Sequence, residues 1–312
     1  MTKKFFVKVV VFSMVLVIFS SAASFAAMSS KHAHKIGILS YLGTDEEKFQ
    51  ESIDNFRKFL SPLAVSTMGT VPEMQDMLRF LQSFRDNKYI IKFYDSLASM
   101  LMAVESGRAD EISLPESTAN YILKNDPSYR ILLAINMPSA VALGFRENDT
   151  ALCEELSKII TAMKEDGTLK AFEEKYIKAA DTEKPAPVEF SNFEGADTIK
   201  VAVTGDMPPI DYISEEGKPA GYNTAVLSEI GRRLQKNIEL INIEAGARSA
   251  ALSSERVDIV FWYRTTQGVT IPKEAGLEGE NPLDNAIKDK TEGVILSAPY
   301  YEWNKYFVLI YD

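Results

Sequence analysis

Histidine and cysteine, whose side chains often carry out nucleophilic or proton-transfer chemistry, are rare in this sequence. Both histidines, His32 and His34, lie near the N-terminus, and such a pair is a weak metal motif. The single cysteine, Cys153, shares a helical apolar spacing with Leu156 and Met163, so we expect a buried structural thiol. The sequence therefore predicts no catalytic residue, no metal site and no cofactor.

Non-covalent binding is better supported, by adjacent aromatic and basic residues. Trp262 and Tyr263 can stack on a ring-bearing ligand or cover its apolar part. Arg264 follows them, and it can make a bidentate contact with a carboxylate or a phosphate, which lysine cannot reproduce. Core packing of the two rings and a surface ion pair of the arginine fit the sequence equally well, so both alternatives stay open.

A second anion site is possible where Gly43 and Thr44 precede a predicted helix. Backbone N–H groups and a hydroxyl at a helix start can bind an anion. Simple N-capping by Thr44 explains the same residues and is the favoured interpretation.

The elements that must position these residues alternate along the chain. Apolar runs typical of strands lie at 35–39, 89–94, 131–135, 141–145, 199–203, 238–243, 257–262 and 306–310. Helical patterns lie at 49–60, 72–81, 97–105, 120–124, 150–177, 223–234 and 248–254. This order predicts an α/β fold, and Gly167 is expected to divide the helical stretch at 150–177.

The alternation occurs twice. A helix leading into SGRADEI at 106–112 is echoed by a helix leading into SERVDIV at 254–260, and 178–197 is expected to be a connector. Chance similarity of ordinary helix-to-strand turns would explain the echo as well. Because 312 residues exceed what one core usually organises, we expect two α/β lobes.

The overall charge excludes one class of partner. The formal charge is -10 and the pI is near 5.0. Nucleic-acid-binding proteins concentrate lysine and arginine to displace counterions, so we expect no nucleic-acid partner.

The N-terminus predicts export. Basic residues at 3, 4 and 8 precede an apolar run at 9–19, and Ser24-Phe25-Ala26 offers small residues for cleavage, so 1–26 is interpreted as a signal peptide. The alternative is a membrane anchor, but the run is shorter than the about 20 residues that cross a bilayer. Cys153 is too distant to carry a lipid at the mature N-terminus. We expect a soluble periplasmic or secreted protein.

Several segments resemble a known family. IKVAVTGDMPPIDYISEEGKPAGYNTAVLSEIGRRL at 199–234 resembles the first strand, Pro-Pro turn, Gly-Lys-Pro hairpin and helix of the extracytoplasmic solute-binding proteins, family 3. RVDIV at 256–260 and SAPYY at 297–301 are similar to later motifs of the same lobe. The resemblance implies a two-lobe type 2 periplasmic-binding-protein-like fold, in which each lobe is a mixed sheet flanked by helices.

The earlier part of the chain resembles the other lobe of that family, in segments at 91–127, 141–149 and 163–177. The order of the lobes is reversed, so the resemblance implies a circular permutation, with lobes at 35–138 and 139–312. It also requires the strands at 141–145 and 306–310 to be neighbours. A domain-swapped dimer and two separately folding modules remain as alternatives, and the oligomeric state stays open.

The resemblance also implies a ligand site between the lobes, although most of the family's amino-acid-binding positions differ here. Met207 replaces a stacking aromatic residue, Thr270 falls near the carboxylate-binding arginine, and Pro115 aligns with the amine-binding aspartate. The implied ligand-binding residues are Arg264, Thr265, Trp262, Tyr263, Met207, Tyr212, Thr44, Glu116 and Arg248.

These observations favour binding over catalysis. The leading hypothesis is that the protein binds a small amino-acid-like, anionic or aromatic solute between its lobes, for an ABC-type importer. A ligand-sensing or partner-docking protein, with its cleft occluded by Phe261, Trp262 and Tyr263, is the first alternative. A dehydratase-like enzyme using Glu116 or Asp206 as an acid is less favoured, because neither has an evident catalytic partner.

Overall fold

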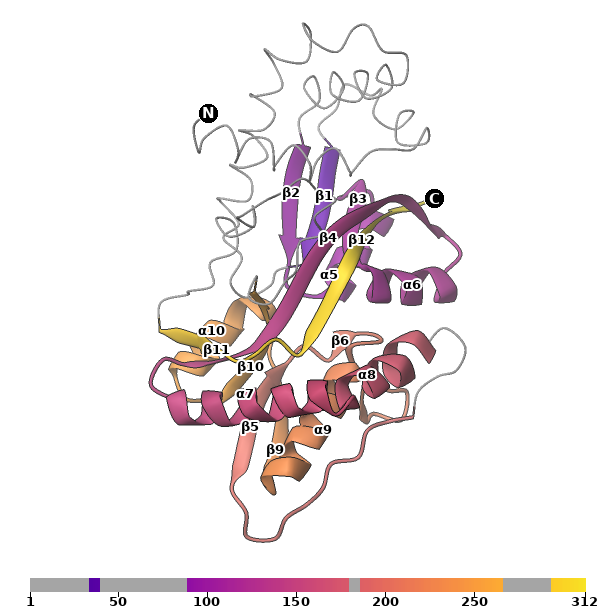
Figure 1. Ribbon diagram of the computed structural model, residues 1–312. Helices are drawn as coiled ribbons and strands as arrows, with labels where there is room; N and C mark the ends of the chain where they lie inside the picture. Colours follow the sequence, from indigo (N-terminus) through magenta and orange to yellow (C-terminus); the bar gives the residue numbers. More distant parts are fainter. Residues whose placement is uncertain (1–33, 40–88, 180–185, 266–292) are drawn as a thin grey trace, which may run out of the picture.

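A computed structural model describes residues 34–39, 89–179, 186–265 and 293–312. The predicted signal peptide, His32, Thr44, the predicted helices at 49–60 and 72–81, and Thr270 lie outside these residues. Element labels follow Figure 1. No helix among the described residues is long and apolar enough to span a membrane.

In the part of the chain that the structure describes, the strands form one mixed nine-stranded sheet in the order β2-β1-β3-β12-β4-β10-β5-β9, with β11 paired to β4. A second, small sheet contains β6, β7 and β8. Helices flank the large sheet (Figure 1). The predicted mixed α/β fold is therefore confirmed.

Two long antiparallel strands, β4 (Tyr129–Arg146) and β12 (Tyr301–Tyr311), lie at the centre of this sheet. Their pairing runs from Tyr301 opposite Val141 to Tyr311 opposite Tyr129. Figure 1 shows both strands crossing between the two ends of the sheet. The two segments that the resemblance requires to be neighbours lie on these paired strands but not opposite each other, because 306–310 pairs with 130–135 and only Val141 of 141–145 faces β12, at Tyr301.

The predicted division into two strands at 131–135 and 141–145 is wrong, because β4 is continuous through Pro138. Proline lacks an N–H group and interrupts a hydrogen-bonded ladder. The pairing with β12 shifts register between Trp303 and Lys305, opposite Ser139 and Asn136. This irregularity accommodates the proline without ending the strand.

One end of the molecule, called here the α5–α6 half, holds the parallel strands β1 (His34–Leu39), β2 (Tyr89–Tyr94) and β3 (Glu111–Pro115). It also holds α5 (Leu97–Glu105) and α6 (Glu116–Asn125). Helix α5 buries Leu97 and Met100 on one face. Helix α6 begins four residues before the predicted 120–124, directly after β3.

The other end, the α7–α10 half, holds β5 (Thr198–Val203), β9 (Asn237–Asn242), β10 (Ile259–Thr265) and β11 (Val294–Leu296). Its helices are α7 (Thr150–Glu165), α8 (Thr168–Phe172), α9 (Tyr222–Leu234) and α10 (Arg248–Ser253), with the short helices Glu173–Lys178 and Ala245–Ala247. Gly167, with a φ of 81°, separates α7 from α8 as predicted.

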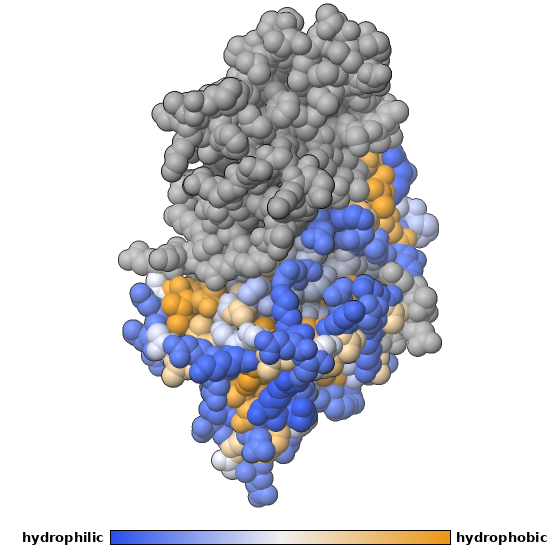
Figure 2. Space-filling view, viewed as in Figure 1, coloured by the Kyte–Doolittle hydropathy of each residue, from blue (hydrophilic) through white to orange (hydrophobic). Residues whose placement is uncertain are grey.

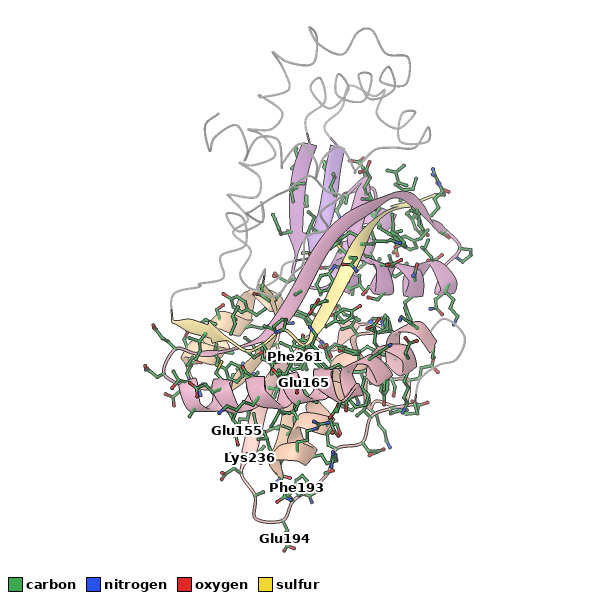
Figure 3. All side chains as sticks on the ribbon, viewed as in Figure 1. Glu155, Glu165, Phe193, Glu194, Lys236 and Phe261 are labelled. Carbon is green, nitrogen blue, oxygen red and sulfur yellow. The ribbon has the colours of Figure 1, made fainter. Side chains whose placement is uncertain are left out.

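Helix α7 packs its apolar face inward. Cys153, Leu156 and Met163 are buried in the main hydrophobic cluster, which confirms a buried thiol. Glu155 and Glu165 lie on the same helix (Figure 3). Phe261, in β10, lies near the middle of the molecule in the same view. Hydrophilic side chains cover much of the described part of this face, with small apolar areas among them (Figure 2).

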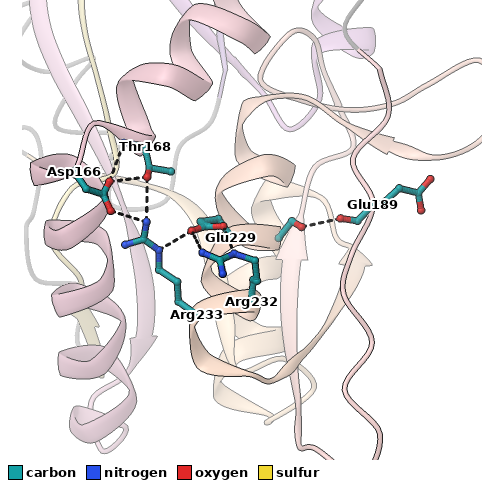
Figure 4. Close-up of polar contacts among 7 residues, drawn as sticks. Asp166, Thr168, Glu189, Glu229, Arg232 and Arg233 are labelled. Atoms are coloured by element: carbon teal, nitrogen blue, oxygen red, sulfur yellow. Dashed lines mark hydrogen bonds and ion pairs between the residues drawn. The ribbon is translucent and has the colours of Figure 1, made fainter.

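A polar network fixes the α7–α8 turn to α9 (Figure 4). The Arg233 guanidinium donates to Asp166 at 2.7 Å, to Thr168 at 3.0 Å and to Glu229 at 2.7 Å. Glu229 also pairs with Arg232 at 2.7 Å. Hydrogen bonds from Thr168 and Arg233 lower the pKa of the exposed Asp166 carboxyl to about 2. All of these contacts lie within the α7–α10 half.

Candidate ligand-binding site

A short hairpin carries several of the predicted residues. It consists of β6 (Asp206–Met207), β7 (Asp211–Ile213) and β8 (Pro219–Ala220), with a cis peptide bond between Pro208 and Pro209. Met207 and Tyr212 are buried. The Tyr212 ring lies 6.4 Å, centroid to centroid, from Tyr121 on α6. The hairpin therefore joins the α7–α10 half to the α5–α6 half.

Asp211 is buried in this hairpin. Its Oδ2 accepts hydrogen bonds from the Thr204 backbone N–H at 2.9 Å and the Thr204 hydroxyl at 2.8 Å. Burial raises the pKa of Asp211, while the Thr204 hydrogen bonds and the Arg248 charge oppose this shift. Thr204 thus anchors the carboxylate to the end of β5.

Asp206, at the start of the hairpin, reaches the other half. Its Oδ2 accepts the Leu97 backbone N–H of α5 at 2.9 Å, and the Ala98 N–H is also bonded to this carboxylate. Its Oδ1 is buried without a hydrogen-bond partner among the described residues. Burial raises the pKa of Asp206, although these N–H groups favour the charged form.

Arg248, the first residue of α10, is 1% exposed. Its Nε donates to the Ile243 carbonyl at 3.1 Å and its Nη1 to the Phe261 carbonyl at 3.2 Å. Its Nη2 has no hydrogen-bond partner in the described part of the chain. Burial lowers the pKa of the guanidinium, and the nearby negative charges include those of Asp211 and Asp206. A guanidinium stays protonated in proteins, so this is a buried cation with a spare donor.

A group of aromatic side chains forms a second contact region, called here the aromatic cluster and defined as Trp262, Tyr301, Trp303 and Tyr306. Trp303 stacks on Tyr301 at 5.5 Å and meets Trp262 edge-on at 5.9 Å and Tyr306 at 5.8 Å. The Tyr301 hydroxyl lies 3.3 Å from the Ser117 hydroxyl in the first turn of α6. The cluster therefore packs β10 against β12 and touches α6.

Trp262 adopts an unusual backbone conformation within this cluster. Its φ is 63°, in the left-handed region, at a bulge where the pairing of β10 with β4 shifts register between Val260 and Tyr263. This region is unfavourable for a bulky side chain. The close packing of the 1% exposed Trp262 ring holds the backbone there.

The structure brings only some of the predicted residues together. Met207, Tyr212 and Arg248 gather around the β6–β7 hairpin, whereas Trp262 lies in the aromatic cluster. The remaining predicted contacts are dispersed: Tyr263 and Thr265 are buried in β10, and Glu116 begins α6, 3.7 Å from Lys305 in a partly exposed ion pair. Thr44 and the Arg264 side chain lie outside the described residues.

Two acidic neighbours of Arg248, Asp95 and Asp211, were not predicted from the sequence, and Asp206 was predicted only as a possible acid. One signal was available, since Asp206 and Asp211 flank the Pro-Pro turn. Their convergence on Arg248 could not be derived from spacing, because it depends on how the hairpin meets α10.

The family comparison bears on this same hairpin and helix. Residues 199–267 match the model of the bacterial extracellular solute-binding proteins, family 3. The match confirms the resemblance for this segment, which contains Met207, Tyr212, Arg248 and Trp262. The segment is less than half of the chain, and no curated protein sequence matches the chain.

Solved structures are similar to the chain at low identity. The binding component of an ABC phosphonate transporter from Pseudomonas aeruginosa is 10% identical, with a TM-score of 0.42, over 90% of this chain and 69% of that chain. A ligand-binding component of an ABC-type import system from Staphylococcus aureus, with zinc bound, is 11% identical, with a TM-score of 0.41, over 90% of this chain and 66% of that chain.

The periplasmic aliphatic sulphonate binding protein from Escherichia coli is 12% identical, with a TM-score of 0.39, over 90% of this chain and 66% of that chain. The aligned part thus spans just under two thirds of the last two proteins. Similarities at this level carry no information about a ligand or its contacts in this chain.

Proposed function

We propose that the protein binds a small solute outside the cytoplasm and delivers it to an ABC-type membrane importer. The carrying observation is the spare Nη2 donor of Arg248, buried beside a hairpin that contacts both halves of the molecule. A buried polar group without a partner is costly, so its retention favours a role in binding. The match of 199–267 to a solute-binding family supports the same proposal.

The halves act as two lobes that close over the solute. In this proposal the lobes are 35–138 and 139–312, in circularly permuted order, with 178–197 as the connector. The antiparallel pairing of β4 with β12 supports this order, since both strands cross between the halves. Closure then shifts the equilibrium between two arrangements toward the one that holds the solute.

The solute carries an anionic group that Arg248 receives. A guanidinium donor in a water-poor site favours a carboxylate or a similar oxyanion. Met207 and Tyr212 supply apolar surface on the same hairpin, while Arg264, Thr265 and Thr44 are further proposed contacts. This chemistry fits an amino-acid-like or aromatic acid.

The test is calorimetry against amino acids, organic acids, sulphonates and phosphonates, together with small-angle scattering with and without each compound. Binding with compaction supports the proposal. In Arg248→Lys the affinity should fall at least tenfold, because lysine keeps the charge but loses the planar donor array. Arg232→Lys, at an exposed arginine on α9, is the matched control and should bind normally. An absence of binding across the whole panel contradicts delivery.

A second candidate function follows from the burial of the predicted contacts. Trp262 and Tyr263 are each 1% exposed, so protein already covers the rings that a ligand would stack on. This favours a sensor or docking protein with an occluded cleft. The same scattering experiment separates the two, because an occluded cleft predicts neither solute binding nor compaction.

Catalysis has less support at the two carboxylates considered for it. Glu116 pairs with Lys305, and Asp206 bonds to the backbone of α5. We therefore assign both to binding or structure, and turnover of any compound in the panel would overturn this assignment.

A further inference from the structure

We infer that Asp206 is a latch between the two halves: its carboxylate, carried by the α7–α10 half, caps the N-terminus of α5 and holds the halves in the arrangement seen here. The inference rests on the proposed function in one respect, that the halves move. It adds a specific residue that controls the movement.

The N-terminus of α5 leaves backbone N–H donors for a carboxylate from another part of the chain. The side chain of its own N-cap, Ser96, accepts the Ser99 N–H at 3.2 Å. The first turn of α5 contains no acidic residue. The first N–H groups of a helix have no partner within the helix, and negative charge is favourable there. Asp206 supplies both an acceptor and a charge to Leu97 and Ala98.

The contact between Asp206 and α5 joins distant parts of the chain. Asp206 and Leu97 are 109 residues apart in sequence, and they belong to different halves. The short helix Ala245–Ala247 also approaches the residues before α5, since a Cβ atom placed on Gly246 would lie 3.2 Å from Asp95 Oδ1. The two halves are therefore in close contact at more than one point near α5.

The environment of Asp206 allows this contact to break when the halves separate. Asp206 Oδ1 is buried without a hydrogen-bond partner among the described residues, so separation of the halves would allow water to solvate it. The nearby charges are Arg248, which attracts the carboxylate, and Asp211, which repels it. The hydrogen bonds to α5 favour the contact and the unsolvated Asp206 Oδ1 disfavours it. Asp206 can therefore stabilise the closed arrangement of the halves without preventing their separation.

The experiment measures the distance between the halves by double electron–electron resonance. In a Cys153→Ala background, spin labels at Met102→Cys on α5 and Glu239→Cys on β9 report on the two halves, because both side chains are exposed. Without added solute, the parent should show mainly the short distance. Asp206→Ala should raise the ratio of separated to closed molecules at least tenfold.

A matched control tests whether the change in distance is specific to Asp206 or follows the removal of any aspartate that accepts a backbone N–H. The Asp258 carboxylate also accepts a backbone N–H, that of Lys200 at 2.9 Å, but within one half. Asp258→Ala should leave the distances unchanged. Ala98→Pro removes one donor to Asp206 at a helical position where proline is tolerated, so it should shift the ratio in the same direction as Asp206→Ala.

The decisive result is the distance distribution of Asp206→Ala. A distribution equal to that of the parent overturns the latch. If this variant does not fold, judged by circular dichroism, Asp206→Asn decides instead, because it removes the charge and keeps an acceptor. Calorimetry on the same proteins separates the two proposals. If Asp206→Ala opens but the parent binds no solute, the latch stands and delivery is contradicted. If the parent binds a solute but Asp206→Ala does not open, delivery stands and the latch is contradicted.

Discussion

The two halves of the molecule meet in two regions of opposite character. In the aromatic cluster, rings of β10 and β12 pack on one another and touch α6 through the Tyr301 hydroxyl. Around Asp206 and Arg248, called here the polar region, the contacts involve charged groups. Buried polar atoms without hydrogen-bond partners among the described residues occur in both regions, for example Trp303 Nε1 and Asp206 Oδ1. Dispersion and burial of apolar surface stabilise the aromatic cluster. The charged groups around Asp206 and Arg248 can instead be solvated by water when the halves separate.

This difference suggests that the aromatic cluster determines stability, whereas the contacts around Asp206 and Arg248 determine how the halves move. Separating packed rings costs free energy, so we expect the aromatic cluster to stay packed beside the crossing strands when the halves move. The polar region can exchange its internal contacts for solvent or a ligand. The following predictions test that division.

The largest expected effect is the loss of a ring from the aromatic cluster. Trp303→Ala should lower the free energy of unfolding by about 3–5 kcal/mol, because it removes a buried ring and leaves a cavity. Urea unfolding followed by circular dichroism measures the change. Tyr311→Ala, at a ring that is 39% exposed, is the control and should cost much less. If Trp303→Ala lowered the free energy of unfolding by less than about 1 kcal/mol, the aromatic cluster would not be a main source of stability.

An intermediate effect is expected from Glu111, a buried carboxyl in β3 away from both regions. Burial, and to a lesser extent Asp110, raises its pKa to about 7. The folded state therefore holds the proton more tightly than the unfolded chain, and stability should fall as pH rises from about 4.5 to 7, by roughly 3 kcal/mol at most.

Glu111→Gln should flatten that pH dependence in urea titrations. The raised pKa values of Asp206 and Asp211 act in the same direction, so part of the pH dependence should remain in this variant. An unchanged slope in Glu111→Gln would show that Glu111 does not titrate as expected.

The smallest effect is expected at the polar network between α8 and α9. Arg233→Met should lower the free energy of unfolding by about 1 kcal/mol, because its ion pairs with Asp166 and Glu229 are only partly shielded from water and such pairs contribute little. Its contacts lie within one half, so spin-label distances between the halves should not change. Any shift in those distances would show that the α7–α10 half does not move as a unit.

Much of the local structure was predictable because it is encoded in short patterns. The helix at 223–234 corresponds to α9, the strand at 89–94 to β2, and the break at Gly167 to the α7–α8 turn. Apolar periodicity and glycine act over a few residues, so the sequence carries them directly. The continuity of β4 was not predictable, because it depends on an irregular pairing with β12 that absorbs Pro138.

The candidate site shows the same limit more strongly. Sequence alone determined that Met207, Tyr212, Arg248 and Trp262 belong to a segment similar to solute-binding proteins. Only the tertiary structure decided that Arg248 is buried with a spare donor, that Trp262 packs on β12, and that Asp206 bonds to a helix 109 residues away. Such contacts depend on how distant elements meet, and neither residue type nor local spacing specifies that geometry.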